Sequence, residues 1–321
     1  MKSLKTSLTL AFTCGILAGA TLSAHAQANN TRIIVPFAAG SVLDTQARFI
    51  AEGLTQRWGK QVIVENVAGS GGNTGAERFF RSAPDGATLF AAPPGPYTVN
   101  RLLYKSINYD ASKFMPVSLM STVPNALIVR KDFPAKNVPE FLAYARANAG
   151  KVSYASQGIG TTPFLIAKRF ESMTNISMNH VPYRGSALAM NDIAAGHIDS
   201  FFDAVSNALS LTQSGSSRIL AVTDVNRSPL LPDVPTMAET IPGFRSLTWF
   251  AIAAPPGTPA ELAQKISADV AAVIASPAIN KRFVELGLTP VGGTPAELAK
   301  FIAEEDAVWS KLITSLKMEP Q

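Results

Sequence analysis

The chain has 321 residues and a formal net charge of +5, and 47% of its residues are hydrophobic whereas 16% are charged. The length is enough for one large domain or two ordinary domains with proper cores. No block of lysine and arginine stands out, so the charge excludes a nucleic-acid surface and favours at most a small anionic ligand. The low share of charged residues is typical of a compact soluble α/β protein.

The first 26 residues have the pattern of a secretory signal peptide. Two lysines precede an apolar run over residues 8–22, and Ala24-His25-Ala26 is a small-x-small cleavage site. The run is too short for a membrane anchor, and no second run follows it. Cutting after Ala26 lowers the charge from +5 to +3 and removes Cys14, so the mature chain is expected to lack disulfides and thiol chemistry. We therefore expect a periplasmic protein.

Short β-branched strands alternate with longer helical patterns after residue 31. This alternation favours a mostly parallel sheet with helices on both faces. The pattern restarts near Val123 and returns near Phe250, which predicts two lobes joined by two crossover strands. Lobe 1 covers residues 27–124 plus 250–321, lobe 2 covers 125–249, and together they enclose a cleft with a hinge. The predicted strands are 32–37, 61–65, 88–91, 126–129, 152–156, 178–181, 197–202, 219–223 and 249–253, and the predicted helices are 44–58, 75–81, 138–148, 162–173, 187–195, 260–275 and 295–316.

The loop after the first strand, Pro36 to Ser41, is built from small residues ahead of a helix. Backbone N–H groups at such a helix start form a ready site for an anion. An ordinary turn between strand and helix, with Asp44 or Ser41 as the N-cap, explains the same residues equally well.

A second loop, Ser156 to Thr162, again joins a strand to a helix and offers hydroxyl groups, N–H groups and two glycines. It lacks the lysine of a phosphate-binding P-loop, and Pro163 stands where a dinucleotide fingerprint needs its third glycine. Cofactor binding is therefore not expected. The glycine-rich loop from Gly69 to Gly75 is interpreted as a tight turn that lets the next helix pack closely, with phosphate binding as the alternative.

The sequence offers no recognisable catalytic or metal-binding pattern. The mature chain has two histidines, His180 and His197, and it contains neither H-E-x-x-H spacing nor a G-x-S-x-G elbow. His180 is interpreted as a hydrogen-bonded histidine at a strand end. Asp199 and Asp203 lie four residues apart, and Asp203, at the end of its strand, is the better candidate for a ligand site. We expect neither an enzyme nor a metal site.

Ordered motifs along the mature chain resemble the solute-binding proteins of tripartite tricarboxylate transporters, the Bug family. The resemblance covers essentially the whole mature chain. Its markers are IIVPFAAG (33–40) with Asp44, VIVENVAGSGGNTGAE (62–77), APDGATL (83–89), YASQGIGTT (154–162), HVPYRGSALA (180–189), LPDVPTMAE (231–239), WFAIAAPPGTP (249–259), and Glu305 with Trp309.

The resemblance implies a type II periplasmic binding protein fold of two lobes, each a sheet flanked by helices. It also implies a carboxylate ligand held mainly by backbone amides and ordered water. Where the family usually has histidine, this chain has Phe164 and Tyr97, which suits a flat aromatic ligand; packing at the rim of the cleft is the alternative. Arg184 is a candidate distal cation. The implied ligand-binding residues are Phe37, Ala39, Gly40, Ser41, Asp44, Tyr97, Ser156, Gly160, Thr161, Thr162, Phe164 and Asp203.

The leading hypothesis is a monomeric periplasmic solute-binding protein that uses no cofactor. It captures a small carboxylate, leaning to an aromatic mono- or dicarboxylate such as a phthalate isomer, and delivers it to a tripartite tricarboxylate-type membrane transporter. Two alternatives stay open, namely binding of an aliphatic di- or tricarboxylate and a role as ligand-sensing partner of a membrane kinase. A secreted enzyme would need a nucleophile–base pair, which the sequence does not supply.

Overall fold

A computed structural model describes residues 30–183 and 185–320 of the chain. The predicted signal peptide with Cys14, its cleavage site after Ala26, and Arg184 lie outside the described residues. Within these two ranges, no single helix is long and apolar enough to cross a membrane. Helices α8 (Ala260–Ala275) and α9 (Pro277–Glu285) pass that test only as a pair, and they are bent by 70°.

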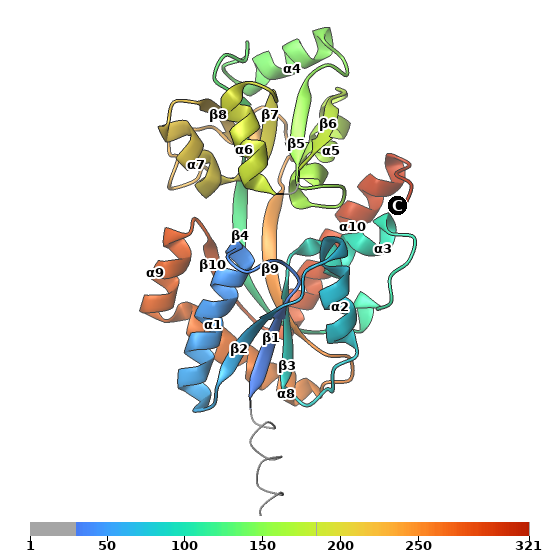
Figure 1. Cartoon of the computed structure of the whole chain (residues 1–321), viewed down its shortest axis with the longest axis vertical. Coiled ribbons are helices and arrows are strands. Elements are labelled where there is room, and N and C mark those ends of the chain that lie inside the picture. The colour runs from blue at the N-terminus through green and yellow to red at the C-terminus, as the bar shows by residue number, and fades with distance from the viewer. Residues whose placement is uncertain (1–29, 184, 321) are drawn as a thin grey trace, which may run out of the picture.

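The first sheet forms the centre of lobe 1 and carries the amino-terminal strands in parallel (Figure 1). Its order is β2-β1-β3-β9-β4, with β9 antiparallel to both of its neighbours and β10 paired with β4. The strands are β1 (Thr31–Val35), β2 (Val62–Asn66), β3 (Thr88–Ala92), β4 (Met115–Arg130), β9 (Leu247–Ala254) and β10 (Thr289–Gly292), and the helices that flank them are α1 (Val42–Trp58), α2 (Asn73–Phe80), α3 (Asn100–Leu103), α8, α9 and α10 (Pro295–Ser315).

The second sheet forms the centre of lobe 2. Parallel strands β7, β5 and β6 lie side by side, and the end of β4 runs antiparallel between β7 and β8. Its strands are β5 (Ser153–Ser156), β6 (Asn179–Pro182), β7 (Ser200–Ala204) and β8 (Ser217–Val222), and its helices are α4 (Val138–Ala147), α5 (Thr162–Thr174), α6 (Ser186–Ala195) and α7 (Val205–Gln213).

Two antiparallel strands, β4 and β9, carry the chain between the lobes (Figure 1). Strand β4 pairs with β9 as far as Pro124, opposite Leu247, and from Asn125 onward it pairs with β7 and β8. The change of sheet therefore falls between Pro124 and Asn125, and β9 rejoins the first sheet at Leu247. The predicted α/β fold with two lobes and two crossover strands is confirmed.

The structure contains several elements that the pattern of residues did not predict. Strand β4 begins at Met115, well before the predicted residue 126, because the ladder with β9 accommodates Pro116 and the residues up to Ser121 through register shifts. Helices α7 and α9, strand β10 and the π-helical turn at Gly95–Val99 are also additional. The residues 230–243 form a loop with one short 3-10 helix at Met237–Glu239, as predicted.

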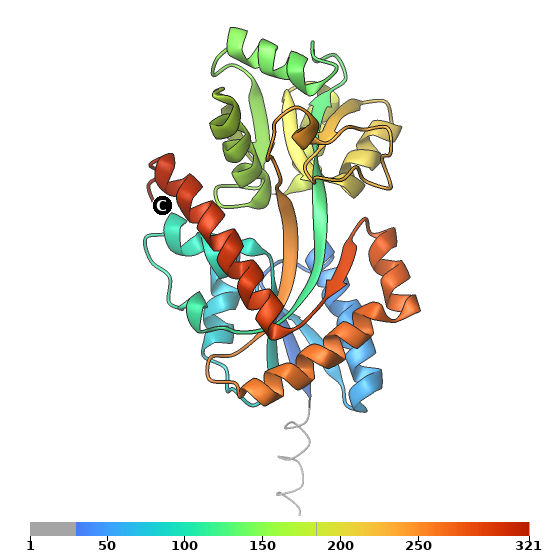
Figure 2. The same cartoon turned by 180° about the vertical axis from the view of Figure 1, so that it is seen from behind.

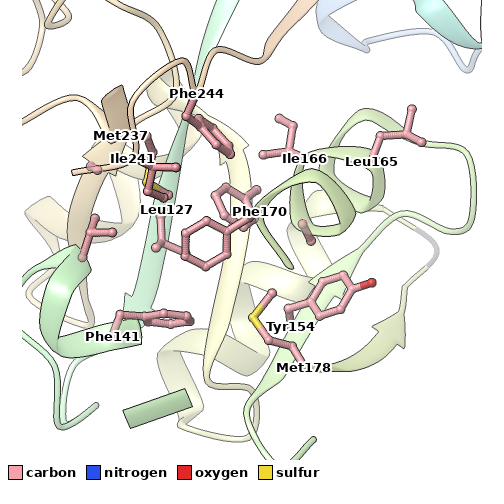
Figure 3. Close-up of a cluster of buried hydrophobic side chains, with 14 of the residues drawn as sticks. Leu127, Phe141, Tyr154, Leu165, Ile166, Phe170, Met178, Met237, Ile241 and Phe244 are labelled. Atoms are coloured by element: carbon pink, nitrogen blue, oxygen red, sulfur yellow. The ribbon is translucent and has the colours of Figure 1, made fainter. Parts of the chain in front are cut away.

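The carboxyl-terminal helix α10 packs against both lobes (Figure 2). Its first turn is closed by a capping box of Thr294 and Glu297, and Leu298 joins the core of lobe 1. Trp309, Leu312 and Ile313, by contrast, join a cluster that links Val99 and Leu103 of lobe 1 to the core of lobe 2, whose aromatic and aliphatic side chains are shown in Figure 3. The assignment of the end of the chain to lobe 1 stays a prediction.

Candidate functional site

The parallel strands of the two lobes point their carboxyl ends toward each other (Figure 1). Open α/β sheets bind their ligands at this edge. The lobes touch on two flanks, because an ideal Cβ on Gly160 would lie 3.2 Å from Leu103 Cδ1, and one on Gly287 would lie 3.0 Å from Ser206 Cβ. The predicted loops after β1 and β5 therefore lie on facing edges, and we place the candidate site between them.

The buried carboxylate of Asp44 fixes the first loop through hydrogen bonds. Its carboxylate, with a residue exposure of 3%, accepts hydrogen bonds from Gly40 N at 2.9 Å, Asn66 Nδ2 at 2.9 Å and Arg48 Nε at 3.0 Å. Burial alone would raise the pKa of Asp44, but these donors outweigh it and hold the pKa below its usual range. The carboxylate of Asp44 and the N–H of Gly40 are thus hydrogen-bonded to each other, and their contact with a ligand stays a prediction.

The donors that the first loop leaves open are backbone N–H groups. Ala38 and Ala39 are exposed, and within the described residues their N–H groups have no hydrogen-bond partner. Ser41 is the N-cap of α1 and its hydroxyl accepts from Asp44 N at 3.2 Å, which confirms one of the two predicted caps. Phe37 is half-buried beside these groups. The loop and the start of α1 together can accept a carboxylate.

The glycine-rich loop supports the first loop from behind. An ideal Cβ on Gly75 would lie 2.7 Å from Pro36 Cβ and 2.9 Å from the carbonyl oxygen of Val67. Only glycine permits α2 to approach this closely, so the structure agrees with the interpretation of a packing turn. Asn100 Nδ2 ties the loop to α3 by donating to Gly71 O at 3.1 Å and to Asn73 Oδ1 at 2.6 Å.

Most side chains of the second loop point inward. The hydroxyl of Ser156, on a fully buried residue, lies 2.6 Å from His180 Nε2 and accepts from Gly158 N at 2.9 Å. The hydroxyl of Thr161 donates to Gly158 O at 2.6 Å. Thr162, the first residue of α5, is half-buried and makes no side-chain hydrogen bond within the described residues. Thr162 is therefore the hydroxyl of this loop that can reach a ligand, together with the N–H groups of the helix start.

Both predicted aromatic residues are buried in the lobe cores, which favours the packing alternative, and their contact with a ligand stays a prediction. Phe164 is 3% exposed and packs its ring against the edge of His180, with a centroid distance of 4.9 Å, inside the core of lobe 2. Tyr97 is 5% exposed in the core of lobe 1, where its hydroxyl donates to Ala251 O at 3.0 Å and burial raises its pKa well above the ordinary value. Tertiary packing, which a single sequence does not display, turned both rings inward.

Asp203 is satisfied within its own lobe. The residue is 5% exposed, and its carboxylate accepts from Ala204 N at 2.9 Å and Asn207 Nδ2 at 3.0 Å. Burial raises its pKa, and the hydrogen bonds from Asn207, Ala204 and Ser186 oppose that rise. It lies near the end of β7, as predicted, and its contact with a ligand stays a prediction.

Two polar residues that the sequence reasoning missed lie beside these groups. Gln157 donates through Nε2 to Ser186 Oγ at 2.6 Å, so the loop after β5 is joined to the start of α6. Asn66 closes the first loop by donating to Phe37 O at 3.0 Å. A polar residue at the carboxyl end of a parallel strand, as Asn66 is, was the signal that could have identified it.

His180 and Ser156 are in contact but lack the features of a catalytic pair. The imidazole stacks on Tyr154 with a centroid distance of 5.0 Å, and burial together with the positive charge of Lys168 lowers its pKa to about 4. A catalytic base needs a partner that stabilises its charged form, whereas these surroundings destabilise it. The ring is a hydrogen-bonded strand-end histidine, as interpreted. Among the described residues, no group of three His, Cys, Asp or Glu side chains could hold a metal ion.

The lowered pKa of His180 predicts an acid-sensitive fold. In the unfolded chain His180 binds a proton below about pH 6.5, whereas in the folded chain it does so only near pH 4. The contribution of His180 to the stability of the fold is therefore complete above pH 6.5 and is lost as the pH falls from 6.5 to 4. Linkage gives a loss of about 2 kcal/mol between pH 7 and pH 5 from this group. Urea unfolding of wild type and His180→Gln at both pH values measures it. An equal loss in the two proteins would show that His180 is not responsible.

Residues 46–318 match the family model described as Tripartite tricarboxylate transporter family receptor. The chain belongs to this family. Solved structures agree over nearly their whole length: R. palustris Rpa4515 with adipate (33% identity, TM-score 0.83, 92% of this chain and 99% of that one), the periplasmic binding protein BugD (33%, 0.79, 91% and 99%), and MatC (Rpa3494) from Rhodopseudomonas palustris with bound malate (29%, 0.79, 89% and 99%). Family membership makes this chain a solute-binding protein and not an enzyme, and the predicted resemblance is confirmed.

Proposed function

We propose that this protein captures a small dicarboxylate between its lobes and delivers it to a tripartite tricarboxylate-type membrane transporter. The observation that carries the proposal is that each of the two loops offers hydrogen-bond donors to a ligand. Ala38 and Ala39 lie in the loop before α1, and Thr162 begins α5; these two loops follow β1 and β5, whose sheets direct their carboxyl ends toward each other (Figure 1). Each helix start favours a negative charge, so two carboxylates at the ends of one ligand satisfy both.

Aliphatic dicarboxylates are the first candidates. Two neighbours at about 30% identity are described with adipate and with malate, both aliphatic dicarboxylates. The predicted preference for an aromatic carboxylate such as a phthalate isomer rested on Phe164 and Tyr97, which are buried in the lobe cores. Phe37, half-buried in the first loop, is the residue that keeps an aromatic ligand as a second candidate.

A binding screen tests this function. Adipate, malate, citrate, benzoate and the phthalate isomers are compared by thermal shift and then by calorimetry, with hexane-1,6-diol as an uncharged match for adipate. A ligand at a hundred times its Kd adds about 2.7 kcal/mol to the stability of the folded state, which is readily seen. We expect an aliphatic dicarboxylate to bind and the diol to fail. Binding of a phthalate isomer tenfold tighter than every aliphatic acid would restore the aromatic assignment, and binding of no carboxylate would contradict the function.

We infer that the protein works in the periplasm, after export and cleavage behind Ala26. Support comes from the lysines, apolar run and small-x-small site of the first 26 residues, and from the periplasmic binding protein BugD among its neighbours. Protein recovered from the periplasm should begin at or near Gln27 on amino-terminal sequencing. An intact Met1 on the recovered protein would rule this out.

A further inference from the structure

Glu305, in the middle of α10, joins the crossover strand to the end of the chain. One oxygen of its carboxylate, Oε2, accepts hydrogen bonds from Trp249 Nε1 and from Trp309 Nε1, each at 3.0 Å. Trp249 lies on β9 and is fully buried, and Trp309 is 2% exposed. A charged acceptor shared by two buried indoles is a strong contact, because leaving a buried N–H unpaired is costly.

The two ends of α10 are fixed to different lobes. Leu298 packs in the core of lobe 1, whereas Trp309 belongs to a cluster that joins Leu103 of lobe 1 to Phe170 of α5 in lobe 2. Figure 2 shows the second half of the helix reaching lobe 2. Between these ends of α10, Arg101 of α3 donates through Nη2 to both oxygens of Asp306 at 2.8 Å. The helix therefore spans the junction and is fastened on both sides of it.

The cluster that contains Trp309 includes α5, the helix that begins at the second loop of the candidate site. Helix α5 starts at Thr162, and Leu103 of lobe 1 lies against Gly160 in that loop. Arg169, further along α5, interacts electrostatically with Glu305. Burial lowers the pKa of Arg169, and the negative charge of Glu305 raises it. The position of α10 and the position of the ligand loop are thus linked through α5.

We propose that Glu305 and Trp309 are positioning residues for ligand binding. Through them, the second half of α10 acts as a strap that fixes the distance between α5 and the first loop. At this distance, one ligand reaches the donor groups of both loops. Releasing the strap widens the range of lobe separations, so a smaller fraction of molecules is competent to bind. The apparent Kd rises in inverse proportion to that fraction. The part of this proposal that concerns affinity rests on the proposed function, whereas the mechanical part does not.

The test replaces Glu305 by leucine, which is similar in size and accepts no hydrogen bond. We expect a larger radius of gyration of the ligand-free protein in small-angle scattering, and about tenfold weaker binding of adipate or malate, a change that corresponds to 1.4 kcal/mol. Glu305→Gln keeps an acceptor oxygen and should restore most of both properties. If Glu305→Leu does not fold, Trp309→Phe keeps an aromatic side chain of smaller size, removes the indole N–H and should show a smaller change in the same direction.

Asp269 offers a matched control inside one lobe. Its Oδ2 accepts from Trp58 Nε1 at 2.7 Å, at the end of lobe 1 far from the junction (Figure 1). Asp269→Leu should lower the melting temperature without changing the radius of gyration or the affinity. If Glu305→Leu behaves like Asp269→Leu, Glu305 is merely structural and the strap is refuted. If wild type binds no dicarboxylate but Glu305→Leu is still expanded, the strap stands and the proposed function fails.

Discussion

Replacing Asp44 by alanine is expected to cost about 2–3 kcal/mol of folding free energy and to weaken ligand binding at least tenfold. The carboxylate is buried beneath the first loop and is the shared acceptor of Gly40 N, Asn66 Nδ2 and Arg48 Nε. Without it, Gly40 N and Asn66 Nδ2 lose their acceptor and the loop loses the contact that fixes its N–H groups. Arg48 contributes little to this cost, because its side chain is 51% exposed.

Urea unfolding and calorimetry with the best dicarboxylate of the screen measure the two effects of Asp44→Ala. Arg48→Met, which removes only the exposed partner, should cost less than about 1 kcal/mol and leave binding nearly intact. Because the pKa of Asp44 is lowered in the fold, its contribution is complete above pH 3.8 and is lost as the pH falls through the folded value. Wild-type affinity in Asp44→Ala would remove the first loop from the site.

Thr162→Val is expected to weaken binding by about 1–3 kcal/mol, which is roughly fivefold to 150-fold, with little change in stability. Valine has the shape of threonine and lacks the hydroxyl that can donate to a carboxylate at the start of α5. Thr161→Val is the matched variant one residue earlier. Its hydroxyl already donates to Gly158 O, so the change should cost about 1 kcal/mol of stability and affect binding less.

Calorimetry and thermal melting on both threonine variants give the comparison. The sequence alone predicted equal roles for Thr161 and Thr162, and the structure separates them by the direction of their hydroxyl groups. A larger loss of affinity in Thr161→Val than in Thr162→Val would show that the loop rearranges when ligand binds. Wild-type affinity in both variants would exclude this loop from the site.

Much of the fold could be predicted because its signals are local. Ser41 caps α1, and a proline stands in the first turn of both α5 and α10. The N–H groups of a first turn have no partner within the helix, so the missing N–H of proline breaks no hydrogen bond there. The beginning of β4 could not be predicted in this way, since Pro116 and Pro124 argue against a strand. Helix α7 was also missed, because its sequence VSNALSLTQ is rich in weak helix formers and gains its stability from packing of Val205 and Ala208.

The site shows the same boundary between local and tertiary information. The two ligand loops were identified because loops that follow parallel strands meet at one edge of a sheet. The directions of the side chains in and near those loops could not be predicted, and Ser156, Phe164 and Tyr97 are all buried. Each direction depends on neighbours such as His180 and Ala251, which are distant in sequence. An aromatic residue near a cleft in sequence is therefore weak evidence for an aromatic ligand.

Lobe 1 cannot complete its sheet until the chain beyond residue 247 is available, because β3 pairs with β9, with Phe90 opposite Ala253. Lobe 2, by contrast, has all its strands in one stretch that ends at Val222. Contacts close in sequence form faster than distant ones, so lobe 2 is able to fold while β1 to β3 still wait for a partner. During that interval the edge of β3, with the mostly apolar sequence TLFAA, is open to pairing with other chains. The insertion that creates the hinge thus also makes the amino-terminal third of the protein its most aggregation-prone part during folding.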